Sequence, residues 1–251
     1  MITDEKKILF ILKDVSFSYP FEEMVLKNLN IRVGQGERVC ILGPNGCGKS
    51  TLLKMFAGLL FPKIGNFTAF DEDMTEKKLN NDKFAKTFHK RIGFIFQDPD
   101  VQLFCSTAEE EIAFGLLQQG VTQDIAKQRI DDIISMLGIE HLRDKTPFKL
   151  SGGEKKKIAL ASVLVMNPEV LIFDEPTNGL DSRMQKWLVE LLAALNISGK
   201  TLISSTHNLE LAAQISDRAI LIDEAHTAVA DLPTGELLQN YDLLKSVNLV
   251  G

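Results

Sequence analysis

The stretch G-P-N-G-C-G-K-S-T at residues 43–51 constrains this chain more than any other feature. It fits the pattern G-x-x-x-x-G-K-[S/T], which marks a phosphate-binding loop when a strand precedes it and a helix follows it. Residues 37–42 have the composition of a short buried strand, and apolar residues recur at helical spacing over residues 52–60. Because both neighbours are present, a chance glycine-rich turn is the weaker interpretation. The stretch predicts a nucleoside triphosphate site.

The residue types of this loop suit a bound phosphate. Gly43, Gly46 and Gly48 allow backbone N–H groups to turn inward around an anion, where a β-carbon would obstruct them. The positive end of the following helix faces the same anion. We expect the Lys49 amine to reach the β- and γ-phosphates and the Ser50 hydroxyl to bind Mg²⁺.

The composition is typical of a globular protein without a membrane span. The 251 residues can bury a full core, and 45% hydrophobic with 25% charged residues is ordinary for a soluble protein. No apolar run approaches the roughly 18 residues of a transmembrane helix. The start, M-I-T-D-E-K-K, lacks the basic-then-apolar order of a signal peptide, so we expect a cytoplasmic protein.

Charged and sulfur-containing residues give weaker indications. The net charge of −6 argues weakly against a nucleic-acid partner. The basic clusters at residues 89–91 and 155–157 are expected to be solvated helix faces or segment ends rather than binding patches. Cys40, Cys47 and Cys105 are odd in number and lack metal-type spacing, so we expect free thiols. The helix start and the neighbouring lysine should lower the pKa of the Cys47 thiol, so that alkylation blocks ATP; a small residue tolerated there is the alternative.

The order of patterns along the chain predicts an α/β fold with an inserted helical segment. Strands are expected at residues 8–19, 24–33, 37–42, 66–70, 92–96, 170–173, 201–205 and 218–222. Helices are expected at residues 52–60, 109–118, 123–137, 152–166, 182–195 and 209–214. Residues 71–89 should be a polar loop with some helix, and the tail from residue 223 should give one more strand and two short helices. Such alternation is typical of a sheet covered by helices on both faces.

The apolar strand at residues 170–173 ends in two carboxylates, Asp174 and Glu175. Such a strand delivers both to the sheet edge where the phosphate-binding loop lies. There Asp174 would belong to the Mg²⁺ shell, and Glu175 would polarise or deprotonate the attacking water. For this pair alone, two acidic residues at an ordinary turn remain the alternative.

A second glycine-rich helix start, L-S-G-G-E at residues 150–154, has two interpretations. Ser151 is a natural N-cap and Glu154 completes a capping box, so the motif can simply begin a helix. Free backbone N–H groups at such a start also make an anion site.

The order of these motifs resembles the nucleotide-binding subunit of ABC transporters over nearly the whole chain. The resemblance implies an α/β fold, a P-loop NTPase core of ABC ATPase type with an inserted helical subdomain and an N-terminal antiparallel β region. It implies a single ABC ATPase domain over residues 1–251. The nucleotide-binding core would take residues 1–97 and 168–251, and the helical subdomain residues 98–167.

The resemblance also implies roles in a site for ATP and Mg²⁺. Tyr19 would stack on adenine, Gln97 would join Mg²⁺ and the water, and His207 would steady the γ-phosphate. Two subunits would face head to tail, so that Ser151 and Gly153 contact the γ-phosphate on the opposite chain. The expected catalytic residues are Lys49, Gln97, Glu175 and His207; the expected Mg²⁺ ligands are Ser50, Gln97 and Asp174; and the expected nucleotide-binding residues are Tyr19, Gly43, Asn45, Gly46, Cys47, Gly48, Lys49, Ser50, Thr51, Ser151 and Gly153.

Residues 97–104 (Q-D-P-D-V-Q-L-F) and 109–115 (E-E-E-I-A-F-G) look like the ATPases of energy-coupling-factor importers, especially the cobalt and nickel branch. This implies a transmembrane coupling subunit, a substrate-binding membrane subunit and a place at the cytoplasmic face of the membrane. Leu103 and Phe104 would contact the coupling subunit or pack inside the helical lobe. The chain ends at Gly251 without the longer C-terminal segment of many vitamin-importing members, which favours the metal branch.

Other functions are weighed against this one. A vitamin-importing ATPase of the same type stays open, as does the choice between a homodimer and a pair of close paralogues. A nucleic-acid-associated ABC ATPase is disfavoured because the chain has one cassette and no long heptad segment. A regulatory module without turnover is disfavoured because Glu175 and His207 are both present.

Overall fold

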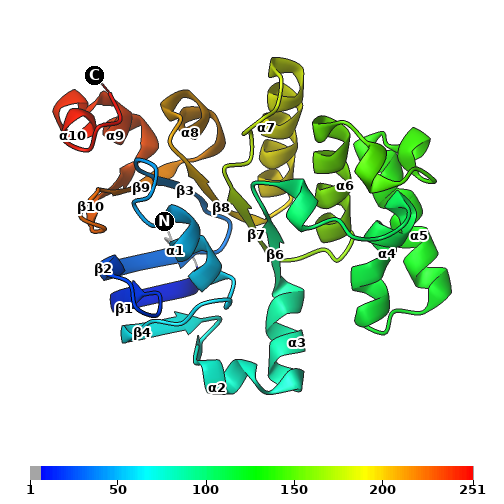
Figure 1. The fold of residues 1–251 in the computed structure, drawn as a ribbon, viewed down its shortest axis with the longest axis horizontal. Helices are drawn as coiled ribbons and strands as arrows, with labels where there is room; N and C mark the ends of the chain where they lie inside the picture. Colours follow the sequence, from blue (N-terminus) through cyan, green and yellow to red (C-terminus); the bar gives the residue numbers. More distant parts are fainter. Residues whose placement is uncertain (1–6, 251) are drawn as a thin grey trace, which may run out of the picture.

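The computed structural model describes residues 7–250, in which two β-sheets and their helices form the fold (Figure 1). The signal-peptide prediction rests mainly on residues 1–6, and the assignment to the metal branch from the chain end rests on Gly251; these residues lie outside the described part of the chain.

A four-stranded antiparallel sheet with the strand order β2-β1-β4-β5 forms the N-terminal part of the fold. Its strands are β1 (Ile8–Ser18), β2 (Met24–Gly34), β4 (Ile64–Ala69) and β5 (Glu72–Asp73). The predicted N-terminal antiparallel region is therefore present. β4 begins two residues before the predicted start because Ile64 already pairs with Ser16 of β1.

The second sheet has six strands in the order β10-β9-β3-β8-β7-β6 and is parallel except where β10 joins β9. Its strands are β3 (Arg38–Leu42), β6 (Ile92–Ile95), β7 (Val170–Asp174), β8 (Thr201–Thr206), β9 (Arg218–Ile222) and β10 (Ala228–Pro233). All five residues of β7 are buried, as expected for a strand covered on both faces.

The helices lie on both faces and at both sides of the parallel sheet (Figure 1). The α-helices are α1 (Lys49–Phe56), α2 (Glu76–Leu79), α3 (Asp82–Arg91), α4 (Ala108–Gln118), α5 (Gln123–Leu137), α6 (Gly152–Leu164), α7 (Ser182–Ile197), α8 (Leu209–Ile215), α9 (Thr234–Gln239) and α10 (Tyr241–Ser246). Short 3₁₀ helices are η1 (Pro99–Val101), η2 (Glu140–Leu142) and η3 (Pro147–Lys149). The α/β ABC-type architecture with a helical insert is confirmed.

The two faces of β7 bury different cores because successive strand residues point to opposite sides. Val170 and Ile172 pack in a cluster with α1 and the antiparallel sheet, so α1 lies between the two sheets. Leu171 and Phe173 pack in a second cluster with α6 and α7. The predicted helical subdomain at 98–167 shares this second cluster with the sheet, and its boundaries stay a prediction.

Two sequence predictions differ from the observed elements. α1 ends at Phe56 rather than near residue 60 because Gly58 has φ +70, and this turn leaves Leu59 half exposed. Residues 71–89, predicted as a polar loop with some helix, are mostly helical, since the side chains of Thr75 and Asn81 cap α2 and α3.

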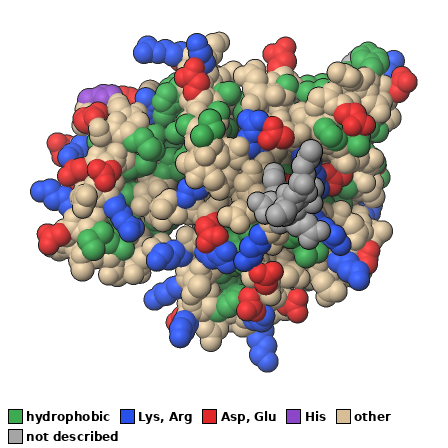
Figure 2. Space-filling model, turned by 180° about the vertical axis from the view of Figure 1, so that it is seen from behind, with side chains coloured by type: hydrophobic (Ala, Val, Ile, Leu, Met, Phe, Trp, Pro, Cys, Tyr) green, Lys and Arg blue, Asp and Glu red, His purple; other side chains and the backbone are tan. Residues whose placement is uncertain are grey.

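On the face drawn in Figure 2, Lys and Arg side chains project beside Asp and Glu side chains, most visibly at the lower edge where α2 and α3 lie. Among the helices of residues 7–250, none has both the length and the apolar character required to cross a bilayer.

Candidate nucleotide site

The phosphate-binding loop takes a backbone shape that depends on glycine at two positions. Gly43 and Gly48 have φ values of +154° and +108°. A β-carbon at Gly43 would lie 2.4 Å from the carbonyl oxygen of Ile222, and one at Gly48 would lie 2.5 Å from that of Val25. Glycine is thus required at both positions because the carbonyl oxygens of Ile222 and Val25 leave no room for a side chain, in addition to any requirement from a bound anion.

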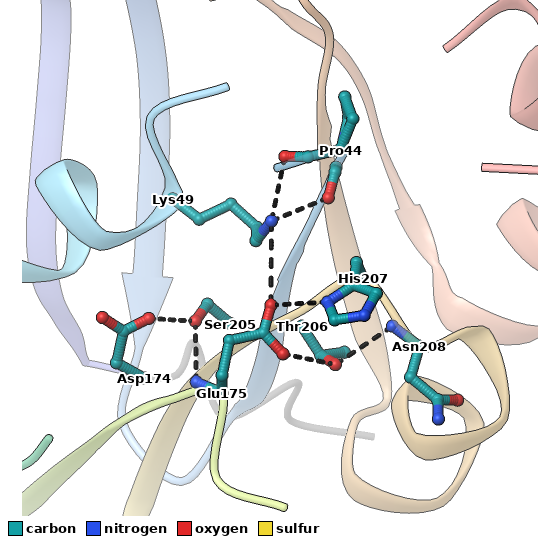
Figure 3. Close-up of polar contacts among 9 residues, drawn as sticks. Pro44, Lys49, Asp174, Glu175, Ser205, Thr206, His207 and Asn208 are labelled. Atoms are coloured by element: carbon teal, nitrogen blue, oxygen red, sulfur yellow. Dashed lines mark hydrogen bonds and ion pairs between the residues drawn. The ribbon is translucent and has the colours of Figure 1, made fainter. Parts of the chain in front are cut away.

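Lys49, the first residue of α1, is held inside its own loop. Its side chain is 7% exposed, and its Nζ donates to the carbonyl oxygens of Gly43 at 2.8 Å and Pro44 at 3.0 Å. The same amine lies 3.7 Å from Oε1 of Glu175 (Figure 3). These contacts hold the Lys49 ammonium at the loop predicted to bind phosphate.

Glu175 follows β7 directly and faces groups from β8. Its Oε1 lies 3.0 Å from Nδ1 of His207, and its Oε2 accepts a hydrogen bond from the Thr206 hydroxyl at 3.2 Å (Figure 3). Its φ of +42° is one that residues with side chains rarely adopt, and such strain is typical of functional sites. The register of the parallel strands brings Glu175 next to Thr206 and His207, because Asp174 pairs with Ser205 and Leu42 pairs with Thr206.

Asp174 points to the neighbouring strand. Its Oδ1 accepts a hydrogen bond from the Ser205 hydroxyl at 2.6 Å, and that hydroxyl also accepts from the backbone N–H of Glu175 at 3.1 Å. The three predicted Mg²⁺ ligands, Ser50, Gln97 and Asp174, all offer oxygen atoms, which Mg²⁺ prefers. Ser50 and Gln97 line the same cavity, whereas Asp174 lies at the end of β7 next to the lining residue Glu175. The donor atoms of all three residues are of the kind that suits this ion.

A cavity of about 280 Å³ joins these elements. Its lining contains the predicted residues Asn45, Gly46, Gly48, Lys49, Ser50, Thr51, Gln97, Glu175 and His207, together with Val25 and Asn178. Sequence reasoning did not identify Asn178, Ser205 or Thr206. The position of Thr206 next to His207 on the same strand end was an available signal, because both precede the turn into α8.

Tyr19 lies beside the loop rather than in this lining. Its hydroxyl is 3.3 Å from the hydroxyl of Thr51, and its ring packs edge-on against Phe17 with centroids 5.1 Å apart. The ring is partly buried in the core that contains α1. Its role against adenine stays a prediction.

Ser151 and Gly153 lie in a different pocket, of about 340 Å³, which also contains Leu180 and Asp181. Ser151 caps α6, and Glu154 closes the predicted capping box by accepting from the Ser151 N–H at 2.9 Å and hydroxyl at 2.7 Å. These hydrogen bonds hold the pKa of the Glu154 carboxyl below its usual range. The structure therefore does not bring Ser151 and Gly153 to the cavity of their own chain.

The cysteine prediction is half right. Cys40, Cys47 and Cys105 are free thiols. The prediction of a lowered pKa at Cys47 is wrong, because the residue is 1% exposed and burial raises the pKa of its thiol more than Lys49 lowers it. The side chain faces the core behind the loop, where it packs with the residues of α1.

The basic cluster at 155–157 is not a solvated helix face. Lys156 is 2% exposed, Lys155 forms an ion pair with Asp100 at 2.6 Å, and the Lys157 amine lies 4.8 Å from the centroid of the Trp187 ring. At 89–91 the Arg91 guanidinium pairs with Glu169 at 2.7 Å. Each of these cations has a specific partner because α6 and α3 pack against other elements.

The structure separates the two open interpretations of Leu103 and Phe104. Leu103 is 3% exposed and belongs to the core under the helices. Phe104 is 59% exposed and packs edge-on against the exposed Phe114, with centroids 4.9 Å apart. Phe104 alone is therefore presented at the surface.

Comparisons with known proteins agree with this geometry. Residues 26–178 match the family model described as ABC transporter. A putative ABC transporter ATP-binding protein of Methanosarcina acetivorans is 46% identical over 245 residues, covering 96% of this chain and 89% of the relative. The nickel import ATP-binding protein NikO of Rhodobacter capsulatus is 40% identical over 245 residues, covering 96% of this chain and 95% of the relative.

Among solved structures, cbiO1 from Clostridium perfringens, described as part of the ABC transporter complex cbiONQ, is similar in fold. It superposes with a TM-score of 0.83 at 32% identity, over 97% of this chain and 96% of that chain. The chain therefore belongs to the ABC transporter family as an ATP-binding cassette, an ATPase that couples ATP hydrolysis to transport.

Proposed function

We propose that this chain is the ATPase subunit of an energy-coupling-factor importer for nickel or cobalt ions. The support comes from the Q-D-P-D-V-Q-L-F segment after β6 and from similarity to a nickel import ATP-binding protein and to cbiO1. An importer of vitamins by the same mechanism is the second candidate, since nothing in an ATPase contacts the cargo.

One observation carries the proposed chemistry: Lys49, Glu175 and His207 meet at a single cavity. The loop N–H groups and Lys49 would hold the β- and γ-phosphates of ATP. Glu175, whose carboxylate lies 3.0 Å from His207, would accept a proton from the attacking water. His207 would then steady the γ-phosphate and the water.

Mg²⁺ would be held by Ser50 and Gln97 at the cavity and by Asp174 at the end of β7. When bound, this ion neutralises charge on the phosphate oxygens. Asp174 is 7% exposed and already oriented by Ser205, so its carboxylate is fixed in advance. A fixed carboxylate loses little conformational freedom on binding an ion.

A second ATPase subunit, identical or a close paralogue, would complete the site. ABC cassettes dimerise and associate with transmembrane subunits, and here the motif at 150–154 lies in its own pocket away from the cavity. Ser151 and Gly153 would bind the γ-phosphate held by the other chain, and the loop at 179–181 would cross between the two. Closure on ATP and opening after hydrolysis would then drive the membrane partner.

The membrane partner would be a transmembrane coupling subunit that docks beside Gln97, with a substrate-binding subunit next to it. Phe104, exposed beside Phe114, would be an apolar contact at this docking site. The two nearby carboxylates both have partners within the chain. Asp100 is paired with Lys155, and the Asp98 carboxylate accepts a hydrogen bond from the Asp100 N–H at 2.9 Å. The chain would thus lie at the cytoplasmic face of the membrane through its partners.

The test is reconstitution in vesicles with the coupling and substrate-binding subunits that its neighbouring genes encode. We expect ATP-dependent uptake of labelled nickel or cobalt, and no uptake when Glu175→Gln replaces the native chain. Uptake of a vitamin instead would move the assignment to the second candidate. Salt-sensitive binding of DNA or RNA without association with membrane subunits would contradict the proposal.

A further inference from the structure

Lys156, in the second turn of α6, is a buried lysine whose ammonium contacts the chain beyond β6. Its Nζ donates to the carbonyl oxygen of Phe96 at 2.9 Å and to that of Gln97 at 3.3 Å. The side chain is 2% exposed, among the largest side chains that the fold buries completely. None of the roles proposed for the nucleotide site uses this residue.

Keeping an ammonium in this position costs free energy. Burial lowers the pKa of Lys156 to about 8, and the carboxylates of Asp174 and Asp98 oppose this effect. Hydrogen bonds from a charged donor are roughly twice as strong as neutral ones, and a carbonyl left without a donor in a buried place is costly. The two hydrogen bonds therefore fix the backbone at Gln97 more firmly than a neutral contact would.

Neighbouring side chains extend the same contact along α6. We call residues 96–102 the lid segment. Lys155 pairs with Asp100 at 2.6 Å, and Nε2 of Gln102 donates to the carbonyl oxygen of Ala159 at 2.8 Å. The lid segment is thus joined to the helix that Ser151 begins, at three places along its length.

Gln97 belongs both to the lid segment and to the nucleotide cavity, which it lines together with Lys49 and Glu175. We propose that Lys156 is a positioning residue: it holds the backbone at Gln97 so that the glutamine side chain reaches Mg²⁺ and the attacking water. Through the same contact α6 and the lid segment move together, which links the cavity of one chain to the Ser151 that serves the other. This inference rests on the role proposed for Gln97.

The first test is Lys156→Met, which keeps the length and removes the charge and both donors. We expect kcat for ATP hydrolysis by the full chain to fall about tenfold or more, since a misplaced group near the reaction can cost on the order of 100-fold. KM for ATP should stay within about twofold, and the Mg²⁺ concentration for half-maximal rate should rise. Lys127→Met, at an exposed lysine of α5, is the matched control and should change none of these values.

The decisive comparison is the double variant with Gln97→Ala. If Lys156 acts through Gln97, the double variant hydrolyses ATP as slowly as Gln97→Ala alone, because coupled residues are not additive. Losses that multiply would overturn the proposal, as would an unchanged kcat and Mg²⁺ dependence in Lys156→Met. An unaffected Gln97→Ala would instead contradict the role of Gln97 itself.

Lys156→Gln keeps an uncharged amide NH₂ group as a donor and covers the case in which Lys156→Met does not fold. The rate of ATP hydrolysis by Lys156→Gln should lie well above that of Lys156→Met. If Lys156→Met cannot be purified, the comparison is made with Gln97→Ala, and Lys156→Gln should again be well above it. Melting temperatures of all variants are measured alongside. A folded Lys156→Gln as slow as Gln97→Ala, with unchanged Mg²⁺ dependence, would contradict a positioning role.

Discussion

The nucleotide cavity and the pocket at the start of α6 are both suited to phosphate, but they differ in what they contain. The cavity holds the Glu175 carboxylate, with the His207 imidazole at 3.0 Å and the Lys49 amine, on a side chain 7% exposed, at 3.7 Å. The pocket has a capped helix start, where a β-carbon on Gly152 would meet nothing within 4 Å. The cavity contains the groups that hydrolysis needs, whereas the pocket contains a glycine-rich helix start whose Ser151 N–H and hydroxyl donate to Glu154. This difference is the basis for our proposal that each is half of a site that two chains complete.

The largest effect should come from the cavity. Glu175→Gln keeps the shape of the side chain and its contact with Thr206, but removes the acceptor for the water proton. We expect hydrolysis to slow by about 100- to 10,000-fold while ATP still binds. Phosphate release and equilibrium dialysis measure the two quantities separately.

Glu190→Gln, at an exposed glutamate of α7, is the control and should hydrolyse ATP at the native rate. Normal ATP hydrolysis by Glu175→Gln would show that Glu175 does not accept the proton of the attacking water. The contrast between a catalytic cavity and a non-catalytic pocket would then lose its support.

A smaller effect should come from the pocket, and it should concern stability. Glu154→Ala removes the hydrogen bonds to Ser151 and should lower the free energy of unfolding by about 1 kcal/mol, as other cap losses do. Glu154→Gln keeps the acceptor and should lose less. Urea titration of both variants measures this, and equal midpoints for Glu154→Ala and the native chain would show that the capping box contributes nothing.

The same contact has a pH dependence with a defined sign. The Ser151 hydrogen bonds lower the pKa of Glu154 from its usual 4.5. This stabilisation is therefore fully present above pH 4.5 and is lost as the pH falls through the lower pKa of the folded state. The difference in stability between Glu154→Ala and the native chain should shrink over that range.

Much of the fold could be predicted because the central strands of the parallel sheet, such as β7, are continuous apolar runs and several turns carry glycine or proline. The carboxyl-edge rule also placed Asp174 and Glu175 near the loop before the structure did. Residues 71–89 were harder, since α2 and α3 are short and depend on the side-chain caps of Thr75 and Asn81.

The errors in the site have a common physical cause, which is burial. Lys156 and Cys47 were assigned by residue type and local sequence, as a solvated cation and an activated thiol. Both side chains are buried, Lys156 at 2% exposure and Cys47 at 1%, by contact with segments far away in sequence. The local sequence does not reveal these contacts, so it cannot predict the desolvation that they cause. Phe104 could not be separated from Leu103 for the same reason.

The central claim is that Ser151 serves the ATP of another chain, and the mass of the Glu175→Gln variant tests it most directly. Light scattering with ATP should show a dimer for Glu175→Gln. The Glu175→Gln, Ser151→Arg double variant should remain a monomer under the same conditions. Its ATP affinity should lie within about twofold of that of Glu175→Gln measured at concentrations too low for dimerisation, because the arginine blocks only the contact between chains. A double variant that still dimerises, or whose monomer no longer binds ATP, would contradict the account.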